Sequence, residues 1–208
     1  MGTRHMIAVV SDGEYRVAQY GQWDGYPSGQ GSSILDFLRK GNVTGLKSNV
    51  LKCSFITDED YKEMWKEFGV DVDKQQFVDG DVSAKFLQKY PQLSRNVGSD
   101  ILKMIADAEN GLRLQDNYNF AADSLFCEWA YVIDFDKETF EVYQGFNETP
   151  LDKNERFFGV VCDRKSTDKD TYYPVKLKAM FSLMDLPDEE EFLLECDPPE
   201  DEGDESDE

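Results

Sequence analysis

The sequence predicts an α+β fold in which an N-terminal and a C-terminal β-hairpin share one antiparallel sheet, with a helical segment between them. Strand-like segments on both sides of Asp12-Gly13, and again on both sides of Asp136-Lys137-Glu138, predict the two hairpins. Apolar residues spaced three or four apart between residues 57 and 110 predict the helices.

The first hairpin is expected over residues 6–20. Met6 to Val10 is a short apolar run, and the residues from Tyr15 to Tyr20 alternate along a second strand. The Asp-Gly pair between the strands tolerates the positive φ angles that a tight hairpin turn needs. Residues 21–31 contain four glycines and one proline, so a loop is expected to follow.

Four helices are expected after this loop. The first begins with the capping pattern of Ser33 and Asp36, buries Ile34, Leu35 and Leu38, and stops at Gly41. The other three are expected to begin at Thr57, Ser83 and Ser99 and to end at Gly69, Pro91 and Asn110-Gly111. The aromatic and methionine residues within them have helical spacing, which favours core packing over a cofactor site.

Strand signals return towards the C-terminus. The second hairpin is expected over residues 129–143, and two shorter strands are expected at Phe157–Cys162 and Tyr173–Leu177. We see no internal repeat and no linker in this part of the chain. Residues 1–187 are therefore expected to form a single α+β domain.

The net charge of −21 is concentrated at the C-terminus. Residues 188–208 hold thirteen acidic residues and no Lys or Arg, which leaves a balance of −8 for residues 1–187. We expect an acidic, disordered tail that keeps the protein soluble or binds a basic protein partner. Nucleic-acid binding is not expected, because the body is acidic and lacks a basic stripe. A charge of −8 also makes the body a poor mimic of nucleic acid.

Composition also limits the compartment and the cofactors. No apolar run approaches the ~18 residues of a membrane helix, and no signal peptide is recognisable, so we expect a cytoplasmic protein that does not contact a membrane. The four cysteines are far apart and the chain has one histidine. We therefore expect free thiols, no zinc or other metal site, and no cofactor.

The glycine-rich loop is the most promising ligand site in the sequence. It lies between a strand and a helix, where glycines let backbone amides approach a ligand and where a helix N-terminus favours an anion. The loop matches neither the Walker A motif nor the dinucleotide-binding fingerprint. The candidate ligand-binding residues are Arg4, His5, Gln22, Trp23, Asp24, Tyr26, Ser28, Gly29 and Gly31.

Several alternatives stay open for these residues. The loop is also consistent with a structural role in which its aromatic rings close the edge of the sheet. A lone histidine such as His5 is more often structural than catalytic. Asp24 or His5 would assist a hydrolysis if the protein is an enzyme, a question that the sequence leaves open.

Other nucleophiles and acids have less support. Cys127 has no base nearby in the sequence, and exposing Thr3 as an N-terminal nucleophile would require removal of Met1 and Gly2. Glu128, Asp134 and Asp136 lie near a turn, where carboxylates are usually solvated. No catalytic residue is therefore assigned.

The N-terminal motifs resemble those of a family of uncharacterised small proteins of microbes and viruses. These proteins open with Met-Gly-Thr-Arg, as Met1–Arg4 do here, and carry a Trp-Asp-Gly-Tyr-Pro loop, as Trp23–Pro27 do. Gly29 and Gly31 also match, and residues 129–146 resemble the closing hairpin of that family. The resemblance implies that the chain is one unit, and it brings no established activity.

Two functions from different classes follow from these observations. The first is the binding of a small polar or phosphate-bearing ligand at loop residues 21–31. The alternative is a non-catalytic protein-interaction module that uses its acidic tail and its exposed aromatic residues.

Overall fold

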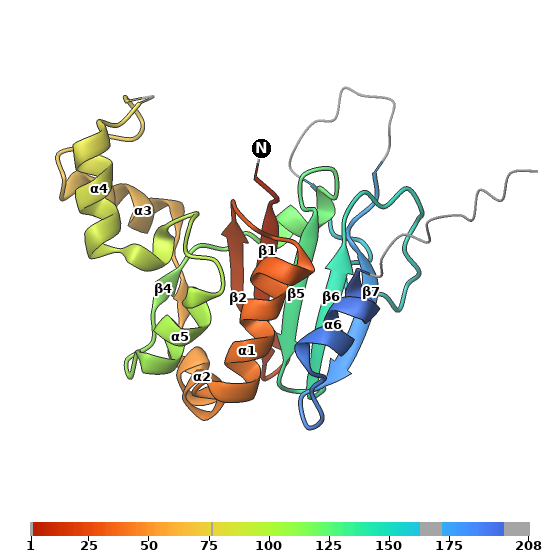
Figure 1. The fold of residues 1–208 in the computed structure, drawn as a ribbon. Helices are drawn as coiled ribbons and strands as arrows, with labels where there is room; N and C mark the ends of the chain where they lie inside the picture. The colour runs from red at the N-terminus through yellow and green to blue at the C-terminus, as the bar shows by residue number, and fades with distance from the viewer. Residues whose placement is uncertain (1, 76, 163–171, 198–208) are drawn as a thin grey trace, which may run out of the picture.

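The computed structural model describes residues 2–75, 77–162 and 172–197. Its main feature is a five-stranded mixed sheet with the strand order β2-β1-β5-β6-β7 (Figure 1). The strands of this sheet are β1 (His5–Ser11), β2 (Glu14–Gly21), β5 (Trp129–Asp134), β6 (Thr139–Gln144) and β7 (Lys176–Ser182). A separate two-stranded parallel sheet is formed by β3 (Ser54–Phe55) and β4 (Arg113–Leu114).

Helices occupy most of the chain between the two hairpins. The α-helices of the described residues are α1 (Ser32–Lys40), α2 (Val43–Asn49), α3 (Asp58–Lys66), α4 (Gly80–Lys89), α5 (Asp100–Asp107) and α6 (Glu189–Cys196). Four short helical turns accompany them: η1 (Pro27–Gly31), η2 (Val50–Lys52), η3 (Pro91–Leu93) and η4 (Tyr118–Ala122). The chain is therefore a mixed α and β protein, as the sequence predicts.

Both predicted hairpins form. β1 and β2 pair in antiparallel fashion, and the turn residues Asp12 and Gly13 have φ angles of 56° and 73°. Positive φ at both positions matches the primed turn that favours a two-residue hairpin connection. β5 and β6 form the second antiparallel hairpin, with Glu138 at φ 56° in its turn.

The way in which the hairpins join differs from the expected antiparallel sheet. β1 and β5 are neighbours and run parallel, from His5 opposite Trp129 to Val10 opposite Asp134. Parallel neighbours need a long crossover connection, and the whole helical middle of the chain supplies it. The sheet is therefore mixed, with one parallel pair between antiparallel ones.

Two further strand predictions need correction. Residues 157–159 form a turn and residues 160–162 have no regular secondary structure, and Gly159 has a φ of 79°, which is incompatible with a strand. The last strand begins at Lys176 rather than at Tyr173, because Pro174 has no amide hydrogen to donate to a ladder. β7 then continues to Ser182, beyond the predicted end.

The sheet is covered on both faces. On one face, Ile7, Val9 and Tyr131 pack against buried residues of α1, α5 and α6. On the other face, Met6 and Ala8 pack against buried residues from η4 and from the segment that follows β6. A separate aromatic cluster packs α3 against α4. In this cluster the rings of Trp65 and Phe86 stack with centroids 3.8 Å apart. Figure 1 shows these two helices at one end of the molecule.

Residues 189–196, which the sequence analysis assigned to the acidic tail, form α6. Phe192 is fully buried, and its ring stacks on that of Phe140 with centroids 5.8 Å apart. Phe192 and Cys196 are one helical turn apart and both are buried, so α6 has an apolar face that its four glutamates obscure in the sequence. The Asp188 side chain accepts a hydrogen bond from the amide of Glu191 and caps the helix. Residues 198–208 lie outside the described residues.

None of the helices in the described ranges is both long enough and apolar enough to cross a bilayer.

The packing of α6 generates a first prediction. Phe192→Ala should lower the free energy of unfolding by about 3–5 kcal/mol, because it empties a fully buried aromatic site. Leu194→Ala on the same helix is the matched control, since Leu194 is 61% exposed and should change stability by less than about 0.5 kcal/mol. Urea denaturation measures both values. Equal, small effects would show that α6 does not belong to the folded core.

Candidate functional site

The glycine-rich loop is held in place by the segment that precedes α5. The amide of Gln22 donates to the Arg95 carbonyl at 2.9 Å, and the Trp23 indole donates to the Asn96 side chain at 2.9 Å. The amide of Ser99 donates to the Gln30 side chain at 2.7 Å. Three contacts from residues 95–99 therefore fix the loop along its length.

Most backbone amides of the loop have partners inside the protein. Gly25 donates to the Thr3 carbonyl at 2.9 Å, and Gln30 donates to the Asp24 carbonyl at 2.8 Å. The amides of Gly29 and Gly31 both donate to the Tyr26 carbonyl. The glycine amides that we expected to approach a phosphate are therefore committed to the loop itself and to the N-terminus.

The glycines instead make room for the protein's own side chains. A Cβ atom on Gly21 would collide with the His5 imidazole, and one on Gly25 would lie 2.8 Å from the His5 Cβ. A Cβ atom on Gly31 would lie 3.0 Å from the Tyr131 hydroxyl. That hydroxyl donates to the Gly25 carbonyl at 2.8 Å. Three of the four loop glycines are thus explained by close packing around His5 and Tyr131.

His5 is a buried, neutral residue. It is 1% exposed, and neither ring nitrogen has a hydrogen-bond partner among the described residues. Burial lowers the pKa of the His5 imidazole to about 4, and the Thr3 backbone and the Asp24 charge only partly oppose this effect. At neutral pH His5 therefore does not supply the positive charge of an anion clamp.

Arg4 lies on the opposite side of the sheet from His5, because successive side chains of a strand alternate. The Arg4 guanidinium stacks over the Phe126 ring, 4.3 Å from its centroid. Its backbone amide donates to the Glu128 carboxylate at 3.2 Å. The side chains of Arg4 and His5 therefore do not contribute to one common ligand site.

The exposed part of the loop carries Trp23 and Tyr26, which are 46% and 40% exposed. The Tyr26 hydroxyl donates to the Asp24 carboxylate at 3.4 Å, and Asp24 has a φ of 55°. Gln22 points elsewhere, since its side-chain oxygen accepts a hydrogen bond of 2.6 Å from the Tyr20 hydroxyl. Of the nine candidate residues, the structure places only Ser28 and Gly29 beside a depression next to the loop.

This depression, which we call the α1–α5 depression, has a volume of about 630 Å³. It lies between α1, along its whole length, the start of α5 and the first residue of α6. Its walls are mostly polar and include residues that the sequence analysis did not select: Ser32, Ser33, Asp36, Phe37, Lys40, Gly41, Ser99, Asp100, Lys103 and Glu189. In the sequence, only the two serines at the start of α1 lie close to the glycine-rich loop. Ser99 and Lys103 come near them only when the chain folds.

Side chains rather than helix amides must provide recognition here. The first amides of α5 are already bonded, since Ser99 donates to Gln30, Asp100 to Val97 and Ile101 to Gly98. Lys40 forms an ion pair with Asp36 one turn away, whereas Lys103 has no ion pair among the described residues. The Ser32 hydroxyl oxygen is buried without a hydrogen-bond partner in the described chain.

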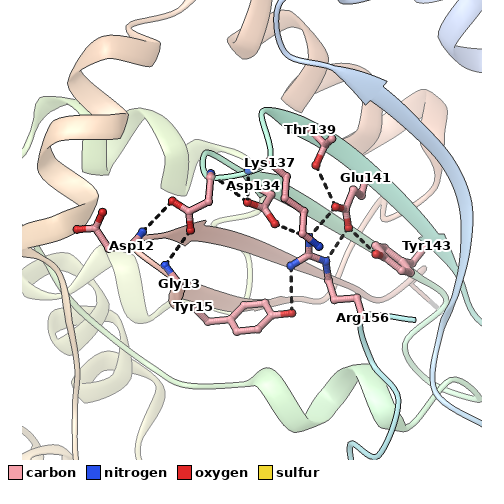
Figure 2. Close-up of polar contacts among 10 residues, drawn as sticks. Asp12, Gly13, Tyr15, Asp134, Lys137, Thr139, Glu141, Tyr143 and Arg156 are labelled. Carbon is pink, nitrogen blue, oxygen red and sulfur yellow. Dashed lines mark hydrogen bonds and ion pairs between the residues drawn. The ribbon is translucent and has the colours of Figure 1, made fainter. Parts of the chain in front are cut away.

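A second candidate constellation is a buried ion cluster, shown in Figure 2. Arg156 lies between Asp134 and Glu141 and donates to Glu141 at 2.6 Å and to Asp134 at 2.5 Å. The Asp134 side chain is 2% exposed, which corrects the expectation that it is solvated. Tyr143 and Thr139 donate to the same Glu141 carboxylate. Two carboxylates in one buried cluster could also serve as a catalytic acid and base. Whether they are ionised decides between a catalytic and a structural role.

The cluster is a structural clamp rather than an acid–base pair. Burial raises the pKa of both Asp134 and Glu141, but the hydrogen bonds and charge of Arg156 outweigh it and hold each pKa below its ordinary value. Both groups are therefore ionised at neutral pH and paired with Arg156. Asp136 supports the same region, because its carboxylate accepts hydrogen bonds from the amides of Asp12 and Gly13 and so joins the two hairpin turns.

The cysteines and possible metal ligands offer no alternative site in the described residues. Burial raises the pKa of the Cys127 thiol, so a nucleophilic thiolate is disfavoured there. Burial also raises the pKa of Cys196, to about 12. No group of three or more His, Cys, Asp or Glu side chains that could hold a metal occurs in residues 2–75, 77–162 and 172–197.

The ion cluster generates a second prediction. Arg156→Met should lower the free energy of unfolding by about 3–5 kcal/mol, because it leaves two buried carboxylates without their counter-ion. Arg113→Met is the matched control, since the side chain of Arg113 is 50% exposed in its pair with Asp60 and its loss should cost about 1 kcal/mol or less. Denaturant unfolding at neutral pH measures both. Similar losses for the two variants would contradict the clamp.

His5 generates a third prediction, on pH dependence. Its pKa is about 4 in the folded protein and near 6.5 in the unfolded chain, so the unfolded chain binds more protons between these values. The free energy of unfolding should therefore fall as the pH drops from 6.5 towards 4, by at most about 3 kcal/mol. Since His5 is the chain's single histidine, His5→Gln should flatten the stability curve in this range. An unchanged slope in the variant would refute the assignment.

Comparisons with known proteins leave the function to be argued from this geometry. No protein-family model matches the chain, and neither the curated proteins nor the solved structures gave a match.

Proposed function

We propose that this protein binds a small hydroxylated ligand with one anionic group in the α1–α5 depression. One observation carries the proposal: four serine residues and Lys103, whose ammonium has no ion pair within the described part of the chain, line a single depression beside the glycine-rich loop. Serine hydroxyls both donate and accept hydrogen bonds, which suits a ligand rich in hydroxyl groups. A volume of about 630 Å³ is in the range of small-molecule sites.

The distribution of charge restricts the ligand further. Asp36, Asp100 and Glu189 face Lys40 and Lys103, so the formal charge of the lining is −1. A polyphosphate would be repelled by this lining, whereas one phosphate or carboxylate can pair with Lys103. A sugar carrying a single phosphate is the ligand class that best satisfies both limits.

The proposal concerns binding and assigns no catalytic step. His5 is buried and neutral beneath the loop, and Asp24 is engaged by Tyr26. The fixed loop supports binding, because a preorganised wall needs little ordering when a ligand arrives. The ligand would contact the side of the loop that carries Ser28 and Gly29.

The alternative of a protein-interaction module has less support in the described residues. The exposed aromatic side chains of Trp23, Phe77, Phe146 and Phe158 belong to four separate segments. The acidic residues 198–208, which would engage a basic partner, lie outside the described residues. A partner that binds through the tail therefore stays a hypothesis.

A fourth prediction tests the ligand site. Glucose 6-phosphate and ribose 5-phosphate, each compared with its unphosphorylated sugar, form the probe panel for thermal shift and calorimetry. Lys103→Gln should weaken binding of the phosphorylated probe by about 10- to 100-fold, which corresponds to one hydrogen bond to a charged group. Ser28→Ala should weaken both members of a pair, because Ser28 is exposed beside the depression and the substitution removes a hydroxyl that can contact the ligand.

The matched control is Lys85→Gln, which removes the same charge from an exposed position on α4. It should leave the affinity within about twofold, because screening at physiological salt limits the reach of surface charges. Absence of any stabilisation by the panel, or equal losses for Lys103→Gln and Lys85→Gln, would reject the proposed site.

A further inference from the structure

A second groove lies at the β2 edge of the sheet, away from the α1–α5 depression. It consists of two depressions of about 280 and 440 Å³ that share Asp116 and Asn117. The first is also lined by Tyr20, Tyr118, Asn119 and Phe120, and the second by Ile56, Thr57, Asp58, Tyr61 and Gln115. We call the two together the Asp116 groove.

The floor of the Asp116 groove is part of the sheet. Asp116 forms a parallel bridge with Ala18, and the amide of Asn117 donates to the Ala18 carbonyl at 2.9 Å. The Asn117 side-chain oxygen accepts a hydrogen bond of 3.2 Å from the amide of Tyr20. The Asp116 carboxylate is oriented by the amide of Tyr118, which donates to it at 2.9 Å. These polar groups are therefore held in position before any ligand binds.

Aromatic rings form the wall beside this floor. Tyr20 and Phe120 pack edge to face with centroids 4.9 Å apart, and Tyr118 packs on Tyr15 at 4.5 Å. Tyr20, Tyr118 and Phe120 are all half-buried, so each ring is anchored while part of it remains accessible. Anchored rings of this kind offer apolar faces at little entropic cost.

The charges around the groove disfavour anionic ligands. Asp58 and Asp116 line it and no Lys or Arg does, which disfavours phosphates and other anions. Burial raises the pKa of the Tyr20 phenol, and the positive charges of Arg4 and Arg95 partly offset that rise. A neutral, polar ligand avoids repulsion by the two carboxylates, and its hydroxyl groups can donate hydrogen bonds to Asp116.

We infer that the Asp116 groove binds a neutral saccharide, with the Asp116 carboxylate and neighbouring amides on its hydroxyls and the aromatic wall on its C–H face. A carboxylate accepts two hydroxyl donors, and a side-chain amide both donates and accepts, which matches adjacent ring hydroxyls. The two depressions share two lining residues and together provide room for two linked sugar units. This inference does not depend on the proposed ligand of the α1–α5 depression.

Chemical-shift mapping of the 15N-labelled full chain tests the inference, with maltose, cellobiose and chitobiose as the probes. At concentrations up to about 50 mM, which detect mM affinities, at least one disaccharide should shift the amide signals of residues 115–120 and 56–61 saturably. Asp116→Ala should weaken that binding at least tenfold. Phe120→Leu should weaken it separately, through loss of the ring face.

Asp107→Ala is the matched control, because Asp107 is exposed on α5 and lines neither depression. It should leave saccharide binding unchanged, as should Lys103→Gln, which separates this test from that of the proposed function. Circular dichroism and thermal unfolding verify that each variant is folded. No saturable shift with any disaccharide, an effect of Asp107→Ala equal to that of Asp116→Ala, or shifts caused by choline instead would overturn the inference.

Discussion

The parallel pairing of β1 with β5 is the contact on which the rest of the structure depends. It places residues that are more than 100 positions apart in adjacent strands, and it brings the Tyr131 hydroxyl to the Gly25 carbonyl. It also brings the first hairpin turn to Asp136, which binds the amides of Asp12 and Gly13. Without this pairing, the glycine-rich loop and the ion cluster of Arg156 would have no common framework.

The sequence predicts those features that depend on neighbouring residues. The hairpin turn at Asp12 and Gly13 and the helix start at Thr57 are local, and both are present. The parallel pairing is not predictable from local patterns, because hydrophobic alternation does not show which strands become neighbours. α6 was missed for another reason: the acidic composition of residues 188–208 outweighed the helical spacing of Phe192 and Cys196.

In the candidate site, too, local features were predictable from the sequence and long-range contacts were not. A loop after β2 was predictable, since glycines after a strand mark a loop before a helix, but its last residues, Pro27–Gly31, form the helical turn η1. The roles of the glycines were not predictable, because the side chains that they accommodate, His5 and Tyr131, come from other parts of the chain. Lys103 lies about 70 residues from the loop, so no local pattern of the sequence could join it to Ser28.

The loop therefore acts as a wall and not as a lid. Most of its backbone amides, its glycines and the Trp23 indole are engaged by the protein, so opening it would expose the His5 nitrogens, which have no partner among the described residues, and break the contacts from residues 95–99. Tyr20 lines the Asp116 groove and also bonds to Gln22, so the same rigid segment borders both depressions. Because neither depression needs the loop to move, ligands should bind to both without a rearrangement of the backbone. Affinity would then be set by the few side chains that touch the ligand.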